Sequence, residues 1–245
     1  MDFYATIRPW YDQIFPFVPA QRDFVLSFGA CPGFSVVDVG CGTGSLIVSL
    51  AKVFRTTVGM DPGETMLEAA RQKATVEPVG TWLIQSGMLN LTNEFPQKSV
   101  DRLICFGNTL PHLSNMDEVR EMLRQSHQVL KPGGLILLQI INFQRIFRKQ
   151  LPGLPTLEND QIRFVRNYRY EGPDPEFIRF HTLLTLKETG ETIENDIPLL
   201  VISEDQLLTA LADTGFHNLQ TFGSFTREPF SVESQPLIVV GESTR

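Results

Sequence analysis

An alternation of short apolar segments with amphipathic ones most constrains how this chain folds. The apolar segments are largely continuous instead of alternating with polar residues, which is typical of strands covered on both faces. Strands of this kind are expected at residues 34–39, 56–60, 81–85, 100–106 and 135–141. Because helical patterns separate them, we expect a parallel sheet with helices on both sides.

The helical segments show apolar stripes at the spacing of one helix face. They are expected at residues 45–54, 64–74 and 115–130. The third is the clearest, because Asn115 and Glu118 resemble a capping pair at its start. The turn KPGG at 131–134 is expected to end this helix and to lead into the next strand.

The pattern changes after residue 142, where β segments follow one another without helices between them. They are expected at 163–170, 177–186 and 192–201, with turns at EGPDPE (171–176) and ETGET (188–192). Ser203 and Gln206 form a capping box for a helix that reaches about Thr214. Two last strands are expected near 219–225 and 237–240. We interpret the chain as one α/β domain that carries an insertion.

Charge and cysteine content limit the kinds of partner. Lysine and arginine number 21 against 28 aspartate and glutamate, a net charge of −7 that does not favour nucleic acid. The three cysteines lack metal-ligand spacing, and MDFYATIRPW at the N-terminus lacks the pattern of a signal peptide. The longest apolar run is too short to cross a bilayer. We therefore expect a cytoplasmic protein with no membrane partner and no metal. The sequence leaves the oligomeric state open.

A glycine turn follows the first expected strand, in VVDVGCGTG at residues 36–44. Gly40, Gly42 and Gly44 let the backbone turn sharply and approach a ligand closely. The next helix offers unpaired N–H groups at its start. Ser45 stands where a dinucleotide-binding G-x-G-x-x-G motif needs its third glycine, and the P-loop ending is absent. The turn is therefore either a ligand loop of another kind or only a tight strand–helix connection.

Asp61 stands at the end of the second expected strand. Ligands of doubly wound sheets bind outside the carboxyl ends of the strands, where an acid can accept hydrogen bonds from both ribose hydroxyls. Asp61 also precedes Pro62 and a helix, so it is equally suited to cap that helix. The two roles are compatible.

The chain resembles the class I methyltransferases that use S-adenosylmethionine, and is similar to their type 11 and type 25 domains. The resemblance rests on DVGCGTG (38–44), MDPGETML (60–67), VDRLICFGN (100–108) and LKPGG (130–134), in the family's order and spacing. It covers roughly residues 30–142. It implies a doubly wound, Rossmann-like, seven-stranded sheet with an antiparallel last strand, and it places the β-rich insertion after the fifth strand.

The resemblance also implies a division of the chain within a single methyltransferase domain, 1–245. We expect an N-terminal helical segment at 1–30 and a cofactor-binding core at 31–142. The β-rich insertion, at 143–201, is expected to be a lid over the substrate. The final helix and the last two strands occupy 202–245.

The resemblance implies S-adenosyl-L-methionine as cofactor and S-adenosyl-L-homocysteine as product. It places Gly40, Gly42 and Gly44 under the methionine part, Asp61 at the ribose, and Pro62 and Met66 at the adenine. The backbone N–H of Met88 is expected at adenine N1. The same resemblance adds Asp38, Cys41, Gly87 and Phe106 to the cofactor site, and Gly87 stands where the family often has an acid.

The loop FGNTLPHLSN at 106–115 looks like the corresponding loop of glycine N-methyltransferase and its relatives. That likeness implies Asn108 and His112 at the methyl acceptor, as positioning residues or as a base. Asn108 as a turn cap and His112 as a loop histidine are the structural alternatives. Those relatives carry an arginine where Ile141 stands here, so glycine is not favoured as the acceptor; Arg145, about one helical turn on, is a substitute.

Arginines and aromatic residues interleave in the insertion, as in RFVRNYRYEG and FIRFHTLL. Such a lining suits an anionic or aromatic small molecule, although solvated edge arginines would give the same pattern. In the N-terminal segment, Tyr4, Trp10, Tyr11 and Phe15 are expected either over the cofactor or in the core.

The sequence therefore predicts an enzyme that moves a methyl group from S-adenosylmethionine, by in-line displacement, to N or O of a small molecule. The alternative is a non-catalytic S-adenosylmethionine-binding or interaction protein with the same fold. Ser45 disfavours a nicotinamide dehydrogenase. Residues 108–111 read NTLP, not the Asn/Asp-Pro-Pro-aromatic signature typical of nucleic-acid methylation.

Overall fold

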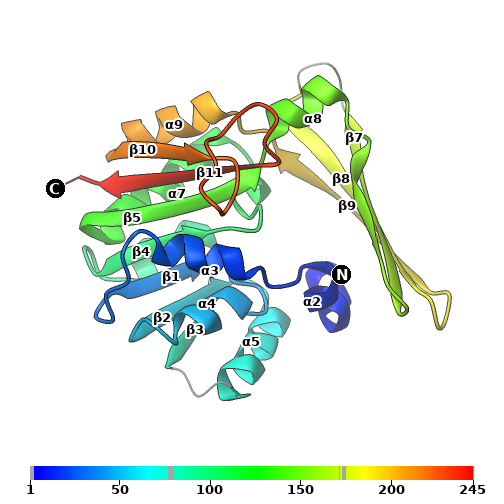
Figure 1. The fold of residues 1–245 in the computed structure, drawn as a ribbon, viewed down its shortest axis with the longest axis horizontal. Helices are drawn as coiled ribbons and strands as arrows, with labels where there is room; N and C mark the ends of the chain where they lie inside the picture. Colours follow the sequence, from blue (N-terminus) through cyan, green and yellow to red (C-terminus); the bar gives the residue numbers. More distant parts are fainter. Residues whose placement is uncertain (1–2, 77–79, 171, 173–174, 245) are drawn as a thin grey trace.

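A computed structural model describes residues 3–76, 80–170, 172 and 175–244. Within them, the strands form a seven-stranded sheet A, in the order β10-β11-β5-β4-β1-β2-β3, and a four-stranded sheet B, in the order β6-β7-β8-β9 (Figure 1). Sheet A consists of β1 (Ser35–Val39), β2 (Thr56–Asp61), β3 (Thr81–Gln85), β4 (Val100–Cys105), β5 (Leu130–Ile141), β10 (Phe216–Phe222) and β11 (Pro236–Ser243). Strand β11 pairs antiparallel with both β5 and β10, as expected for the last strand.

Helices cover both faces of sheet A, as the apolar strands predict. Helices α3 (Pro19–Leu26) and α4 (Ser45–Leu50) pack on one face, where Phe24 and Ile47 meet Ile104 of β4. Helices α7 (Met116–Val129) and α9 (Glu204–Asp213) cover the other face, where Met122 meets Leu103 (Figure 1). Helix α5 (Glu64–Val76) follows β2, while η2 (Met88–Asn90) and α6 (Leu91–Glu94) connect β3 to β4. Neighbouring positions of β4 thus point to opposite faces, and the prediction of a doubly wound sheet is confirmed.

Several boundaries differ from those expected. Helix α4 ends at Leu50 instead of reaching Phe54. The KPGG segment lies inside β5, where the pairing with β4 jumps from Val100↔Leu130 to Arg102↔Leu135. This segment is an irregularity within the strand, since left-handed Gly133 (φ 76°) lets the chain bulge and rejoin the ladder. Strand β10 starts at Phe216, three residues earlier than expected.

The helix caps follow their sequence signals closely. Asn115 accepts a hydrogen bond from the backbone N–H of Glu118 through Oδ1, at 2.9 Å, and so caps α7. The Glu118 carboxylate accepts from the backbone N–H of Ser114 instead of closing a box on Asn115. At α9, Ser203 and Gln206 make both bonds of a capping box.

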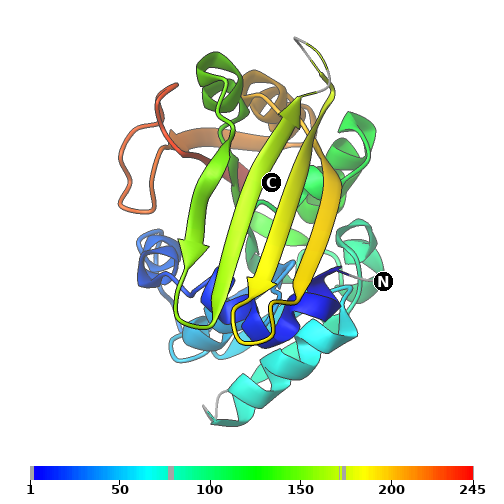
Figure 2. The same ribbon diagram turned by 90° about the vertical axis from the view of Figure 1, so that its right-hand side faces the viewer.

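Sheet B stands at the end of the molecule to which the parallel strands of sheet A point (Figures 1 and 2). It contains β6 (Gly153–Glu158), β7 (Ile162–Tyr170), β8 (Phe177–Leu186) and β9 (Thr192–Leu200), all antiparallel. Strand β6 and the preceding helix α8 (Phe143–Lys149) were not expected. Of the EGPDPE turn, residues 171, 173 and 174 lie outside the described residues.

The N-terminal segment packs on one end of sheet B. It forms α1 (Phe3–Ile7), η1 (Arg8–Trp10) and α2 (Tyr11–Ile14). Ile7 and Ile14 share an apolar cluster with Phe164 and Leu184 of sheet B. Trp10 and Tyr11 pack against this cluster, so the aromatic residues of the segment serve the core as well as the site described below. No helix in the described part of the chain is long and apolar enough to span a membrane.

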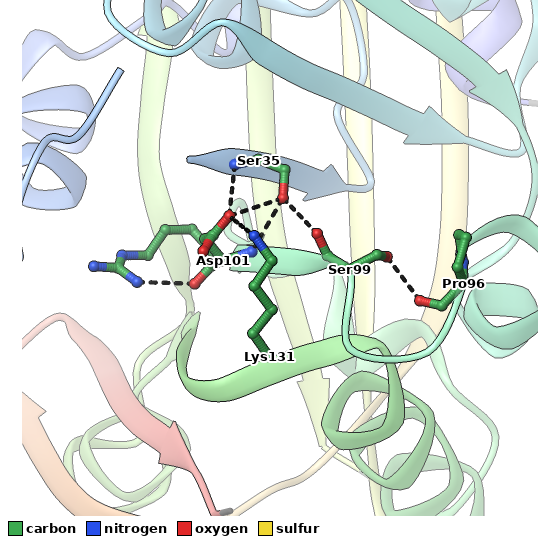
Figure 3. Close-up of polar contacts among 6 residues, drawn as sticks. Ser35, Pro96, Ser99, Asp101 and Lys131 are labelled. Carbon is green, nitrogen blue, oxygen red and sulfur yellow. Dashed lines mark hydrogen bonds and ion pairs between the residues drawn. The ribbon is translucent and has the colours of Figure 1, made fainter. Parts of the chain in front are cut away.

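A polar cluster ties together the amino ends of β1, β4 and β5 (Figure 3). The Asp101 carboxylate accepts hydrogen bonds from the backbone N–H of Ser35 at 2.9 Å and from Lys131 Nζ at 2.7 Å. Burial alone would raise the pKa of Asp101, but these hydrogen bonds and the Lys131 charge outweigh it and hold the pKa below its ordinary value.

We expect Asp101→Asn to lower the free energy of unfolding at neutral pH. A carboxyl whose folded pKa is depressed stabilises the fold above its unfolded pKa, and this stabilisation is lost as pH falls through the folded pKa. The expected loss is about 1–3 kcal/mol, toward the lower end because the Lys131 side chain is 42% exposed. Urea unfolding at pH 7 measures it, and an unchanged midpoint would contradict it.

Candidate functional site

The glycine turn after β1 is fixed by the neighbouring strand. Gly40, Gly42 and Gly44 all have positive φ, at 74°, 54° and 75°. The backbone N–H groups of Gly40 and Cys41 donate to the Met60 carbonyl at 2.7 and 3.1 Å. The turn is therefore anchored to the end of β2, at the carboxyl edge of sheet A.

The same turn packs against the loop that follows β4. A Cβ on Gly40 would lie 2.4 Å from Thr109 Cγ2, which no side chain tolerates. A Cβ on Gly42 would lie 3.0 Å from the Tyr11 hydroxyl. The glycine turn, the FGNTLPH loop and the N-terminal segment thus meet at one place. A Cβ on Gly44 would instead lie 2.7 Å from Ala70 Cβ, so this glycine allows α4 and α5 to pack closely.

Asp61 lies beside the glycine turn, and backbone donors orient its carboxylate. The N–H of Gly42 donates to Oδ2 at 2.9 Å, and the N–H of Gly63 donates to Oδ1 at 2.8 Å. The second bond is the cap-like contact that the sequence allowed. The first connects the carboxylate to the glycine turn. These two bonds hold the Asp61 carboxylate in the wall of a cavity.

That cavity has a volume of about 480 Å³, within the usual range for small-molecule sites. Of the predicted cofactor residues, its lining includes Gly40, Gly42, Asp61, Pro62, Met66, Gly87 and Met88. Of the predicted catalytic residues, it includes His112. Residues of the lining that were not predicted are Gly63, Ser86, Leu89, Asn90, Gly107, Thr109 and Leu113. Tyr4 and Tyr11 complete it, from the N-terminal segment.

The remaining predicted residues are not among those that line the cavity. Asp38 and Phe106 are buried, and Phe106 packs in the core with α3 and α4. The Cys41 sulfur points toward Gly59 of β2, where an added Cβ would lie 2.9 Å from it. Asn108 adopts a left-handed conformation (φ 63°), and its Oδ1 accepts from the N–H of Ile141 at 2.9 Å. This bond ties the loop to the end of β5.

His112 and Tyr4 form a hydrogen-bonded pair on the cavity wall. The Tyr4 hydroxyl lies 3.0 Å from His112 Nε2, while His112 Nδ1 lies 3.2 Å from the carbonyl oxygens of Asn108 and Thr109. Carbonyl oxygens only accept, so the neutral imidazole carries its proton on Nδ1 and accepts the Tyr4 proton at Nε2. Desolvation lowers the pKa of His112, although the side chain is accessible from the cavity. His112 is therefore neutral at neutral pH and can accept a proton there.

Asp38 lies under the glycine turn in a fully buried position. Burial, and then the negative charge of Asp61, raise its pKa from 3.8 to about 7. A raised carboxyl pKa means that the folded state keeps a proton that the unfolded chain releases. Stability from this group is therefore fully present below pH 4 and is lost as pH rises toward 7.

We expect Asp38→Asn to remove this dependence. The wild-type free energy of unfolding should fall, relative to that of the variant, by about 4 kcal/mol between pH 4 and pH 8, from the shift of the Asp38 pKa. Denaturant unfolding of both proteins across this range measures Asp38 together with its coupling to Asp61, because carboxyl groups that do not interact with Asp38 cancel in the difference. Parallel stability curves would show that the Asp38 pKa is not raised.

The cavity fits S-adenosylmethionine in shape and in chemistry. An added Cβ on Gly87 or Gly107 would meet no atom within 4 Å, so neither residue fills the cavity. Pro62 and Met66 offer an apolar wall suited to a flat ring, and the Asp61 carboxylate offers acceptors for hydroxyl groups. No group of three or more histidine, cysteine or acidic side chains within the described residues is placed to hold a metal.

Comparisons with known proteins agree with this chemistry. Residues 36–134 match the sequence profile of the family described as "Methyltransferase domain". A Geobacillus sp. (strain WCH70) protein described as "Putative methyltransferase" is 26% identical over 98% of this chain and 99% of its own length. The ubiquinone biosynthesis O-methyltransferase of Proteus mirabilis (strain HI4320) is 32% identical, over 57% of this chain and 58% of its own length.

Among solved structures, an S-adenosylmethionine-dependent methyltransferase from Clostridium acetobutylicum ATCC 824 shares the fold. Its TM-score is 0.84 over 100% of both chains, at 15% identity. The fold is Rossmann-like, and the match to the methyltransferase profile supports S-adenosylmethionine as the cofactor. The profile match over residues 36–134 and the similar proteins support the resemblance to class I S-adenosylmethionine-dependent methyltransferases.

Proposed function

We propose that this methyltransferase acts on N or O of a small molecule that binds between the cofactor cavity and sheet B. The observation that carries the proposal is the Tyr4–His112 pair, which lines the cofactor cavity. Strand β9 of sheet B packs against both α1 and η3 (Leu110–His112), the elements that carry the pair. An acceptor at this place lies beside both the cofactor and a proton acceptor.

The residues around the cavity are proposed to hold the cofactor and to align the acceptor. Asp61 accepts hydrogen bonds from ribose hydroxyls, and Gly40 and Gly42 leave room for the backbone to approach the ligand. When bound, S-adenosylmethionine supplies an electrophilic sulfonium methyl group and becomes S-adenosylhomocysteine. Holding the two reactants in line contributes about 7–11 kcal/mol to such a reaction.

His112 and Tyr4 are proposed to remove the proton that the acceptor loses. As the new bond to the methyl carbon forms and the carbon–sulfur bond breaks, the acceptor proton passes to the Tyr4 oxygen. In the same step, the Tyr4 proton moves to His112 Nε2, so the tyrosine oxygen never carries two protons. The carbonyl oxygens of Asn108 and Thr109 stabilise the resulting imidazolium through Nδ1–H. A proton acceptor placed in this way contributes roughly 10²–10⁴-fold in rate.

The test is a screen for transfer of a labelled methyl group to amines, phenols, alcohols and carboxylates. A methylated amine, phenol or alcohol supports the proposal and decides between N and O. Binding of S-adenosylmethionine without turnover across a broad panel favours the non-catalytic alternative. Methylation of nucleic acid or of protein only would overturn the proposed acceptor class.

We also propose the cytoplasm as the site of action. Cys31, Cys41 and Cys105 are all free thiols, which suits a reducing compartment. The net charge of −7 supports a small-molecule acceptor over a nucleic-acid backbone. Fractionation of the native host cell, with the protein detected by antibody, tests the compartment.

A further inference from the structure

Sheet B carries a row of polar side chains on the face that packs toward the rest of the molecule. Arg166, Thr182 and Asn195 are directly paired across β7, β8 and β9. Because side chains alternate along a strand, paired residues share a face and lie about 5 Å apart at Cβ. We call these three residues the polar row.

Apolar residues flank the polar row on both sides. Two positions away on β7 and β8, Phe164 and Leu184 pack with the N-terminal helices. Two positions away in the other direction on β7, Tyr168 packs with the core that sheet A shares with α7. The polar row therefore lies at the boundary between two apolar clusters, where unpaired polar groups are costly.

Each residue of the row has one buried polar atom with no hydrogen-bond partner within the described part of the chain, although another nitrogen of Arg166, Nη2, donates to the Pro155 carbonyl at 2.5 Å. These are Arg166 Nε, Thr182 Oγ1 and Asn195 Nδ2, together with the neighbouring Tyr168 hydroxyl and Arg145 Nε. Thr182 is only 1% exposed and Tyr168 only 6%. Most buried polar groups are hydrogen-bonded, and an orphaned group costs about 1–3 kcal/mol. Five such atoms from neighbouring positions indicate a site that a ligand completes.

The charges of the site match an anion. Arg145 and Arg166 make no ion pair with a carboxylate among the residues that the structure describes. On the opposite face of sheet B, by contrast, Arg169 and Arg179 both pair with Asp196, at 2.7 and 2.9 Å. The Tyr170 hydroxyl donates to the carbonyl of Ile146 at 3.3 Å, so the residue after Arg145 lies beside the strand that carries Arg166 and Tyr168. Each orphaned nitrogen is a donor, and both hydroxyls can donate.

The site lies within reach of the reaction centre. Arg145 is in the first turn of α8, where its backbone N–H donates to the capping Asn142 side chain at 3.2 Å. The residue before this cap, Ile141, is bonded to Asn108 of the loop that carries His112. Strand β9, which carries Asn195, packs against η3. The polar row therefore includes a strand that packs against the element carrying His112.

We propose that Arg145, Arg166, Tyr168, Thr182 and Asn195 bind an oxyanion, carboxylate or phosphate, of the methyl acceptor. The proposal rests on the proposed function, because it assigns the group by which that acceptor is held. Guanidinium groups form paired hydrogen bonds with such oxyanions. The hydroxyl and amide donors bind the remaining oxygen lone pairs, so the acceptor is an acid whose N or O nucleophile lies toward Tyr4.

The test uses calorimetry on the protein saturated with S-adenosylhomocysteine, titrated with benzoate, with inorganic phosphate and with neutral benzamide. We expect benzoate or phosphate to bind and benzamide not to bind, and the preferred anion identifies the oxyanion. Arg166→Gln should weaken binding of that anion at least 10-fold. The matched control, Arg169→Gln, changes an arginine on the opposite face of the same strand and should leave the affinity unchanged.

Two results would overturn the proposal: no anion binding by the wild type, or equal weakening by Arg166→Gln and Arg169→Gln. S-adenosylhomocysteine binding is measured first on every variant. If the wild type does not bind S-adenosylhomocysteine, the proposed cofactor site is wrong. If it binds S-adenosylhomocysteine but no anion, only the proposed anion site at the polar row is wrong.

A second variant keeps the proposal testable should Arg166→Gln fail to fold. Thr182→Val replaces an orphaned hydroxyl with a methyl group of the same shape, so thermal stability should be equal or higher. Anion affinity should fall severalfold. A clear drop in the melting temperature with unchanged anion affinity would show that the hydroxyl is satisfied within the fold, and would overturn its role.

Discussion

Replacing Asp61 with asparagine is expected to weaken S-adenosylhomocysteine binding about 10- to 150-fold, because hydrogen bonds to a charged group contribute about 1.5–3 kcal/mol. In the wild type, both carboxylate oxygens accept from backbone N–H groups of Gly42 and Gly63. An asparagine amide would set an NH₂ group against one of these donors. The variant therefore loses both the charge and the orientation of the side chain.

Calorimetric titration of the folded variant measures this effect. Glu64→Gln is the matched control, since it removes a nearby carboxylate that pairs with Arg71 at the surface instead of facing the cavity. The control should bind as the wild type does. Unchanged affinity of Asp61→Asn would mean that Asp61 serves only to cap the following helix.

Replacing His112 with glutamine is expected to lower turnover by roughly 10²–10⁴-fold while cofactor affinity changes little. Glutamine can still bond to Tyr4, but it cannot take up a proton. Tyr4→Phe should also lower turnover, because the proposed proton path runs through the Tyr4 hydroxyl. Single-turnover rates with the acceptor found in the screen measure both effects.

The pH dependence of the rate separates a base from a structural histidine. Desolvation lowers the pKa of His112 below 6.5, so the wild type should remain active until the pH falls under that value. The acidic limb of the profile should disappear in His112→Gln. An unchanged profile in the variant would assign the proton transfer to another group.

The alternation of apolar strands and helices made sheet A predictable, because its central strands β1 and β4 are buried on both faces and need helices on each side. The capping box at Ser203 could also be predicted from the sequence, because both of its hydrogen bonds join residues three positions apart. Local signals failed where a tertiary contact decides the conformation. The KPGG segment looks like a turn in isolation, yet pairing with β4 draws it into β5.

The residues predicted at the cofactor lie in short, contiguous motifs, and most of them line one cavity. The proposed acceptor side is assembled from segments far apart in sequence, so no local motif predicts it. Tyr4 meets His112 across 108 residues. The polar row depends on strand register within sheet B, and a shift of one residue would turn its side chains to the opposite face. Asn108 accepts a hydrogen bond from the backbone N–H of Ile141, and its place at the acceptor stays a prediction.

The most direct test of the account is whether the cavity beside Asp61 binds the cofactor. The resonance of S-adenosylmethionine labelled with ¹³C at the transferred methyl group can be followed as wild-type protein is added. We expect it to shift or broaden in proportion to the protein added, and to return when S-adenosylhomocysteine displaces it. An unchanged resonance at millimolar cofactor and protein would contradict the assignment of this cavity.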